Sequence, residues 1–319
     1  MPTQAGQVLG VIGYVYIDGK IVRATSCDVK MTQNIEPGNV VDGYVDKTTY
    51  SLGPQEVGGT IAFPAVWEDG DTVTSNLWNK CLVRRSSGEF AGVISDLSVK
   101  YADQAAYHYY NYCYVDTFEF NATQSETVNI SVGIIGQLRD ESATVRPLPF
   151  FGNRNSRLVT WNEATVSFSP NGSDGTYNIK SDEIRTFTCT VNNNTQRFYG
   201  LNGLLTPVVI APTKRDITGS ISIMGRNASL ARYAYNNQNR CTEPSTVCFG
   251  YTIGKGMTDT GCNGSFNVSI PGTIFNIEEI AITNELLETT VAYRCLPGSY
   301  SGDGGSLTTD FTTDSCGND

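Results

Sequence analysis

A short glycine-containing pattern occurs twice in the chain and limits what the chain can fold into. The first copy is QEVGGTIAF, from Gln55 to Phe63, and the second is RDITGSISI, from Arg215 to Ile223. In both, an apolar residue is followed by one other residue, a glycine (Gly59 or Gly219), and then alternating polar and apolar residues. Such alternation is typical of a strand with one buried face. The recurrence predicts a duplicated β unit in which each glycine begins a strand where a side chain would obstruct close packing or bending.

Features on either side of this pattern recur in the same order. Each half has an earlier strand, then the glycine strand, then a short amphipathic helix, and finally a closing hairpin. The matched segments are Ile21–Thr32 with Leu158–Ser169, Ser75–Leu82 with Asn227–Tyr235, and Tyr114–Gly136 with Phe275–Gly298. Because many β proteins use the same few short sequence patterns, the repeated order of these features is stronger evidence for duplication than any single match.

The two halves differ in the interval between the first strand and the glycine strand. The offset between the halves is 137 at the first strand and 160 at the glycine, so the second half has about 23 additional residues there. That region includes Thr186–Leu205, in which two β-like runs flank the turn-forming residues Asn192, Asn193 and Asn194. We expect a hairpin at about 186–205, inserted only in the second copy.

The length of 319 residues and the charged content of 17% favour two mainly β domains. We predict two tandem β-sandwich or barrel domains, each with one short α-helix, over residues 1–142 and 156–298. Residues 143–155 contain two prolines and are expected to form an ordered linker. Residues 299–319 are rich in Gly, Ser and Asp, and we expect an exposed tail that is flexible in the isolated chain.

The chain offers little for catalysis. It has a single histidine, His108, which excludes most triads and multi-histidine metal sites. Neighbouring carboxylates such as Glu278 and Glu279 point to opposite faces of a strand, so they read as solvated charge. We predict no catalytic, cofactor-binding or metal-binding residues. The tyrosine-rich run Tyr107–Tyr114 leaves two interpretations open, a buried or interfacial strand and a binding platform for sugar or single-stranded nucleic acid.

Nine cysteines are many for a cytoplasmic protein, and no two of them have the two-residue spacing of zinc knuckles. An odd number leaves at least one thiol unpaired within the chain. Two interpretations remain: buried small apolar side chains, and disulfides that form within or between chains after exposure to oxidant. The candidates for bridging are Cys241, Cys248, Cys262, Cys295 and Cys316.

Charge and hydropathy limit the partners of the chain and the compartment in which we expect it to fold. The net charge of −10 argues against a protein that holds nucleic acid by attraction. The chain lacks an apolar run long enough to span a membrane and lacks a recognisable signal peptide, so we expect no membrane insertion and folding in a cytoplasm.

The layout of early strand, hairpin, ITG(S/T)-type strand with following helix, and closing hairpin resembles the tail tube proteins of long-tailed bacteriophages over about residues 10–298. The resemblance implies β-sandwich domains flanked by a helix, with six domains in each ring. Stacked rings form the tube that carries DNA from the virion into the host. Some members fuse two such domains, which would make each ring a trimer with pseudo-hexameric symmetry.

The same resemblance implies the partners and the location of the protein. The partners would be other copies of the chain and other tail proteins, such as a sheath, baseplate or terminator. DNA would pass through without specific binding, and no cofactor would be needed. The protein would belong to the virion tail and assemble in the host cytoplasm.

Two alternatives stay open. One is a different phage component, namely a tail terminator, a baseplate protein or a capsid-decorating protein. The other is an extracellular β-sandwich adhesin, favoured by many cysteines and by Asn-x-Ser/Thr triplets but not by the missing export signal. These triplets begin at Asn121, Asn129, Asn171, Asn193, Asn227, Asn263 and Asn267.

Overall fold

The structure of the protein is a computed structural model. It describes residues 14–18, 20–37, 50–67, 73–82, 93–94, 97–100, 107–142, 157–169, 184–224, 245–253, 264–280, 288–295 and 308–313. The elements are β1 Tyr14–Ile17, β2 Lys20–Val22, β3 Ser26–Cys27, β4 Lys30–Pro37, β5 Tyr50–Pro64, β6 Val66–Trp67, α1 Val73–Leu82, β7 Val93–Ile94, β8 Leu97–Lys100, β9 Tyr107–Asn111, β10 Cys113–Thr123, β11 Asn129–Gly136, β12 Leu138–Ser142, β13 Arg157–Leu158, η1 Trp161–Glu163, β14 Ala164–Ser169, β15 Ile184–Asn192, β16 Thr195–Phe198, β17 Val209–Pro212, β18 Asp216–Met224, β19 Ser245–Ile253, β20 Gly264–Ile280, β21 Glu288–Cys295 and β22 Thr308–Thr313. The prediction of a mainly β protein is confirmed.

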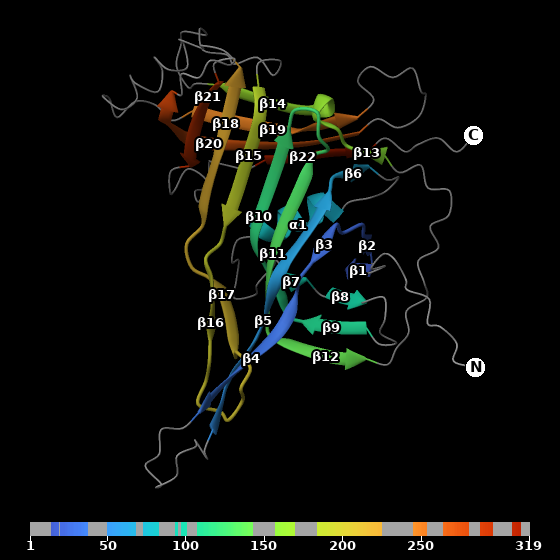
Figure 1. Ribbon diagram of the computed structural model, residues 1–319, viewed down its shortest axis with the longest axis vertical. Helices are drawn as coiled ribbons and strands as arrows, with labels where there is room; N and C mark the ends of the chain where they lie inside the picture. Colours follow the sequence, from blue (N-terminus) through green and yellow to red (C-terminus); the bar gives the residue numbers. More distant parts are fainter. Residues whose placement is uncertain are drawn as a thin grey trace, which may run out of the picture.

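One large sheet runs through both halves of the chain. Its order is β14-β19-β20-β21-β18-β15-β10-β11-β5-β3, with β22, β4 and β7 paired to β20, β5 and β10. The two halves meet where β10 pairs antiparallel with β15, from Thr117 opposite Asn192 to Thr123 opposite Thr186. We call this ladder the internal junction. In Figure 1 the strands β5, β10, β11, β15 and β18 run along the length of the molecule.

Smaller sheets complete the fold. A five-stranded sheet has the order β12-β9-β8-β1-β2, and two-stranded sheets are formed by β13 with β6 and by β16 with β17. The β13–β6 pair again joins the halves, because Leu158 lies opposite Val66. The hairpins β4–β5 and β16–β17 project together at one end of the molecule (Figure 1).

The helix α1 lies within a core shared by the two halves. Trp78 is fully buried and contacts Phe118 of β10 edge to face, with ring centroids 5.0 Å apart. It also contacts Phe249 of β19 and Phe266 of β20, at 5.8 and 6.4 Å. A buried aromatic side chain contributes a large apolar area, so Trp78 couples the stability of the first half to strands of the second.

Strand pairing follows the same order in each half. In the first, β5 pairs with β4 and β11, and β11 pairs with β10; in the second, β18 pairs with β15 and β21, and β21 pairs with β20. Around these strands, the order β1-β8-β9-β12 in the first half has its counterpart in β14-β19-β20-β22 in the second. The β9–β10 segment corresponds to the single long strand β20.

The two long hairpins also share a register, with a constant offset of 160. Equivalent opposed pairs are Cys27–Ile61 and Phe187–Ile221, Lys30–Gly58 and Thr190–Thr218, and Ile35–Leu52 and Thr195–Pro212. The register slips by one residue at the same place in each, around Asn34 and Asn194. A hairpin of matching register is therefore present in the first half as well as the second.

Several sequence-based expectations need correction. The residues Asn192–Asn194 are no hairpin turn, because β15 and β16 form one arm and β17 and β18 form the return arm. The strand β14 pairs with β19, so it does not take the place that β4 takes beside β5. The counterpart of β4 is β15, which the sequence pattern assigns to an inserted hairpin.

The C-terminal expectation also changes. Thr308–Thr313 form β22, which pairs with β20 from Gly264 to Ser269, so this part of the tail is a strand. The expected helix at 75–82 is confirmed within α1. The second expected helix, at 227–235, and the linker at 143–155 lie outside the described residues.

Candidate assembly surfaces

Gly59 lies inside β5, where the short link between β3 and β4 passes close to it. Its φ of +155° is in the region that favours glycine. A Cβ at this position would lie 2.5 Å from the Cα of Val29 and 2.6 Å from its backbone nitrogen. Because the obstructing atoms are backbone, the strand pair could not admit a side chain here without moving.

Gly219 lies at the equivalent position of β18. A Cβ there would lie 2.1 Å from the carbonyl oxygen of Thr188 and 2.4 Å from the ring of Tyr293. The Tyr293 side chain passes over Gly219, and its hydroxyl donates to the Thr188 carbonyl over 2.8 Å. Both glycines therefore sit in the middle of strands and allow close packing there, rather than marking where a strand begins.

A buried asparagine fastens the internal junction. The side-chain nitrogen of Asn193 donates to the carbonyl of Cys81 at 2.8 Å and to that of Val115 at 3.0 Å. Its oxygen accepts a bond from Nε of Arg215 at 2.8 Å, and its backbone N–H donates to the Asp116 carbonyl. One residue thus joins the end of α1, β10 and the start of β18, which come from both halves.

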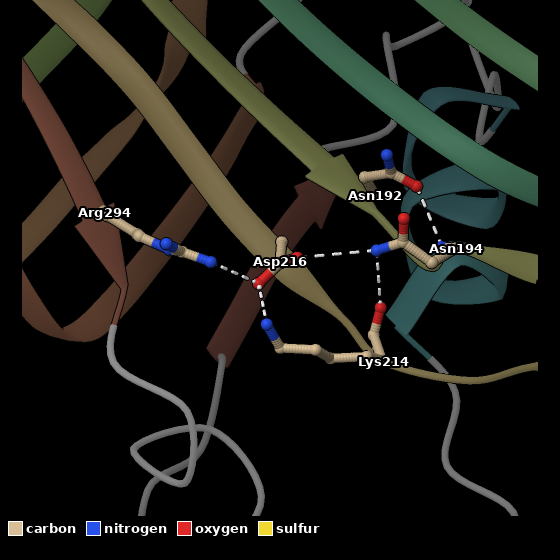
Figure 2. A network of polar contacts seen from close by, with 5 residues as sticks. All are labelled: Asn192, Asn194, Lys214, Asp216 and Arg294. Carbon is tan, nitrogen blue, oxygen red and sulfur yellow. Dashed lines mark hydrogen bonds and ion pairs between the residues drawn. The ribbon is translucent and has the colours of Figure 1, made fainter.

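Next to it lies an exposed polar cluster, shown in Figure 2. Asp216 accepts from Arg294 at 2.9 Å and pairs with Lys214 at 3.3 Å. Asn194 donates to the Lys214 carbonyl at 2.8 Å. The Arg294 guanidinium, with help from Lys214 and against a smaller effect of burial, holds the pKa of the Asp216 carboxyl below its usual value. The cluster ties β21 to the base of β18.

Several strand edges have no described strand beside them, such as the outer edges of β14 and β2, and two further ones lie on β20 and β4. Thr273 of β20 pairs with Ser245 of β19 on one side and with Cys295 of β21 on the other. The pairing with β19 ends there, so Asn276–Ile280 of β20 have β21 on one side and no described strand on the other. Likewise β4 pairs with β5 on one side, and no described strand flanks Lys30–Thr32 on the other. We call these two segments the open edges. Exposed edges of this kind invite pairing with another chain.

The projecting hairpins form a second candidate surface. The hairpin of β16 and β17 lies against β5: the backbone N–H of Gln55 donates to the Leu205 carbonyl at 2.8 Å, and Arg197 donates to the Val57 carbonyl. Large apolar side chains are exposed along both hairpins, namely Ile35, Leu52, Phe198, Tyr199, Leu201, Leu204, Val208 and Val209. Such a concentration of exposed apolar groups is typical of a contact surface.

The described cysteines are not joined to one another by disulfides. Cys81, Cys113 and Cys189 are buried, and burial raises the pKa of each to about 12. Among the bridging candidates, Cys295 is buried with a pKa of about 12, and Cys248 is half-buried. Cys241, Cys262 and Cys316 lie outside the described residues.

The residues that the structure describes bear on the expectation of no metal site. No group of three or more His, Cys, Asp or Glu residues that could hold a metal ion occurs among them. His108 is buried in β9, opposite Val99 of β8 and Glu141 of β12. The tyrosine run around it forms β9 and the start of β10, which fits the strand interpretation. Among the described helices, none has the length and apolar character needed to cross a membrane.

Sequence patterns indicate the glycine strands but miss the functional geometry around them. They assign Asn193 to a turn, and only its contacts reveal a buried node. They predict neither open edge. The signal that could have found them is the constant offset of 160 through the whole hairpin, which pairs Asn34 with Asn194 as well as Gly59 with Gly219.

Long strands, open edges, projecting apolar hairpins and a shared hydrophobic core define a mainly β protein with exposed surfaces on which other chains could pack. The model of one protein family, described as phage tail tube protein, matches residues 65–293. That match covers more than half of the chain and parts of both halves, so the chain belongs to the phage tail tube protein family and is a structural component of the phage tail. A search of curated proteins finds no match to this chain.

Proposed function

We propose that this chain is the subunit of a stacked-ring tail tube through which phage DNA passes into the host. Each ring would contain three chains, and each chain would supply two tube units that arose by duplication. The observation that carries this proposal is the repeated strand order, in which every main ladder of one half has a counterpart in the other. Family membership supports the tube itself.

Duplication is supported at residue level. Ile61 lies opposite Val132 and Ile221 lies opposite Val291, and all four side chains are fully buried. The glycines 59 and 219 lie two residues earlier in their strands and serve the same close approach of a neighbouring strand. Equivalent positions thus have equivalent burial, as expected if two copies of one unit retained their core after fusion.

Ring formation follows from how the two units already join. Within one chain, a strand of the first unit pairs with a strand of the second at the internal junction, and the equivalent strands at the far ends are the open edges. A head-to-tail contact that repeats by rotation closes into a ring. Three chains with two units each would place six units around that ring.

The charge of the chain suits passage of DNA. Each Lys or Arg contact to a phosphate adds affinity by releasing counterions, so an attractive channel would retain the genome. A net charge of −10 lowers such attraction. The tube would also contact other tail proteins, such as a terminator, a baseplate and, in a contractile tail, a sheath.

Electron microscopy of the purified protein or of the virion tests this proposal. We expect stacked rings with three-fold symmetry and six similar lobes. Rings that never stack would favour a terminator or baseplate role, and particles in which the protein covers the capsid would favour decoration. A chain that stays monomeric at high concentration would contradict every ring assembly and would leave an adhesin as the alternative.

Cysteine bridging is a separate part of the proposal. We propose that some of Cys241, Cys248, Cys262, Cys295 and Cys316 join chains after exposure to air. Cys248 is the favoured described candidate because it is half-buried, whereas Cys295 is buried. Electrophoresis without reductant should show multimers that collapse to monomers with reductant, and a single monomer band in both conditions would contradict bridging.

A further inference from the structure

The internal junction shows how one tube unit pairs with the next. It aligns seven residue pairs in a continuous antiparallel ladder between β10 and β15. Along it, Phe118 lies opposite Val191 and Phe120 lies opposite Cys189, and all four side chains are fully buried. The junction is therefore a continuation of the core and not a loose contact.

The open edges are the counterparts of the two strands in this junction. Lys30–Thr32 of β4 correspond to Thr190–Asn192 of β15 through the offset of 160. In the same way, Ile277 of β20 corresponds to Phe118 of β10. Ile277 pairs with Val291, which pairs with Ile221. Phe118 pairs with Val132, which pairs with Ile61, the residue equivalent to Ile221. Each open edge thus has, inside the same chain, a copy that is already paired.

Burial differs between the paired copy and the open one. Val191 and Phe187 in β15 are fully buried beside β10. Their counterparts Met31 and Cys27 are only half-buried, although both pack against the core. This difference is what the lack of a neighbouring strand would produce.

We propose that Asn276–Ile280 of one chain pair antiparallel with Lys30–Thr32 of a second copy, in the register of the internal junction. This inference rests on the proposed function, because it specifies how the chains of a ring join. It places Asn276 opposite Thr32 and Ile277 opposite Met31, as Thr117 lies opposite Asn192 and Phe118 opposite Val191.

Charge agrees with this register. The ladder between β20 and β21 slips by one residue between Ile277 and Glu279, so Glu278 is the extra residue of a bulge. The register therefore brings Lys30 opposite the Glu278–Glu279 pair. Opposite charges across an antiparallel pair stabilise it, and like charges weaken it. The adjacent acidic residues, which had no role as a catalytic pair, gain one as the partner of a basic residue.

The pairing ends next to Val29. The Tyr110 hydroxyl donates to the Val29 carbonyl over 2.8 Å, so that carbonyl already accepts one bond from within the chain. Lys30, Met31 and Thr32 carry the contact. On the β20 side the edge begins after Thr273, where β19 ends its pairing.

Disulfide trapping tests the register. Opposed residues in an antiparallel ladder have Cα atoms about 4.5 to 5.5 Å apart, within the range that a disulfide spans. We expect the double variant T32C/N276C, oxidised in assembled rings, to give covalent multimers in which mass spectrometry finds positions 32 and 276 joined. The matched control N34C/N276C moves one cysteine two residues along the same strand, leaves Lys30 in place, and should give several-fold less product. The wild-type chain, oxidised in the same way, is the control for disulfides formed by its native cysteines.

Charge reversal provides a second measurement. We expect K30E and E278K/E279K each to weaken association roughly two- to fivefold per contact, and the combination K30E/E278K/E279K to recover most of that loss. E126K, in the exposed turn after β10, is a control that should leave association unchanged. Association is measured as the concentration at which half of the chains sediment as rings.

The outcomes separate the inference from the proposed function. Wild-type rings together with a dominant 32–276 link and recovery in the combined variant support the register. Wild-type rings in which the control pair cross-links as well as T32C/N276C, or in which the combined variant is weaker than either parent, overturn the register and leave the ring in place. Absence of wild-type rings overturns both.

Discussion

The internal junction and the open edges use the same kind of strand in two different states. At the junction, β15 has a strand on each side and its apolar residues Val191 and Cys189 are fully buried. At the open edge, β4 has a described strand only on the β5 side, and Met31 is half-buried. The comparison teaches that strands of matching register can form an internal seam or an open edge, depending on what the chain places beside them.

The internal junction and the open edge of β4 also differ in the contacts of the residue where each long hairpin changes register, Asn193 in the second half and Gln33 in the first. In the second half, Asn193 is buried and bonds to α1, β10 and Arg215. The side chain of its counterpart Gln33 makes a long contact of 3.4 Å to the Gly53 carbonyl. A buried polar side chain with several partners fixes a unique arrangement. The internal junction has such a residue, whereas Gln33 at the open edge of β4 is only half-buried.

The largest loss in the free energy of unfolding should come from replacing either of the two strand glycines, Gly59 and Gly219, by alanine. Gly59→Ala adds a Cβ against the Val29 backbone at a φ of +155°, so strain and overpacking combine to cost about 2 to 5 kcal/mol in the free energy of unfolding. Gly219→Ala has only the overpacking and should cost about 1 to 3 kcal/mol. Denaturant unfolding of the unassembled chain measures both.

Gly203→Ala is the control for this pair. Gly203 has a φ of +76° but no atom within 4 Å of where a Cβ would lie, so it isolates the backbone strain, about 1 to 2 kcal/mol. A loss at Gly59 no greater than that at Gly203 would show that strand crowding does not matter in the first half.

Asn193→Ala should have the next largest effect. It removes the acceptor of Arg215 and the donor to two buried carbonyls, which should lower the free energy of unfolding by about 2 to 3 kcal/mol. Gln33→Ala, the equivalent change at the open edge, should cost less than about 1 kcal/mol. Equal losses, measured by the same unfolding curves, would remove the distinction between a fixed junction and an adaptable edge.

Thiol labelling should separate the two regions without changing the sequence. Burial raises the pKa of Cys189 to about 12, so at pH 8 its reactive thiolate is roughly one molecule in ten thousand. Cys27 is half-buried at the edge of the first half and should react sooner, although burial raises its pKa as well. Alkylation followed by peptide mass spectrometry gives both rates.

Assembly should leave the labelling rate of Cys189 as it was, because Cys189 is already buried at the internal junction. Unchanged labelling of Cys27 in rings would show that the second copy covers only Lys30–Thr32, and slower labelling would show that it also covers β3. Raising the pH increases the thiolate fraction at both sites, so the comparison between free chain and ring is made at one pH.

The smallest effect should come from Asp216 in the exposed cluster of Figure 2. Because Arg294 lowers the pKa of Asp216 in the folded chain, its contribution to stability is present above the ordinary value of 3.8 and is lost as the pH falls through the lower folded value. D216N should flatten this acid-side slope slightly, since the cluster is exposed and screened by solvent. Identical pH profiles for the variant and the wild type would mean that the Arg294 bond does not stabilise the fold.

Local patterns in the sequence are enough for the strand content, the helix at 75–82 and the recurrence around Gly59 and Gly219. Alternation and glycine placement act over a few residues, so they survive without knowledge of the fold. The same patterns misplace a turn at Asn192–Asn194, because a run of asparagines favours both a turn and a bend between two collinear strands. They also take Thr308–Thr313 for tail, since composition does not reveal a strand that is held by β20.

The sequence by itself determined that this chain is a β protein with a recurring strand pattern and few residues suited to catalysis, because those properties depend on residue types and their spacing. Only the tertiary structure decided which strands lie side by side, since pairing brings together residues far apart in the chain that no local pattern relates. That is why Asn193 became a buried node with Cys81, and why β10 found β15 as its neighbour. The same pairing left Lys30 and Asn276 on edges that no described strand covers, which is the basis of the proposed pairing with a second chain.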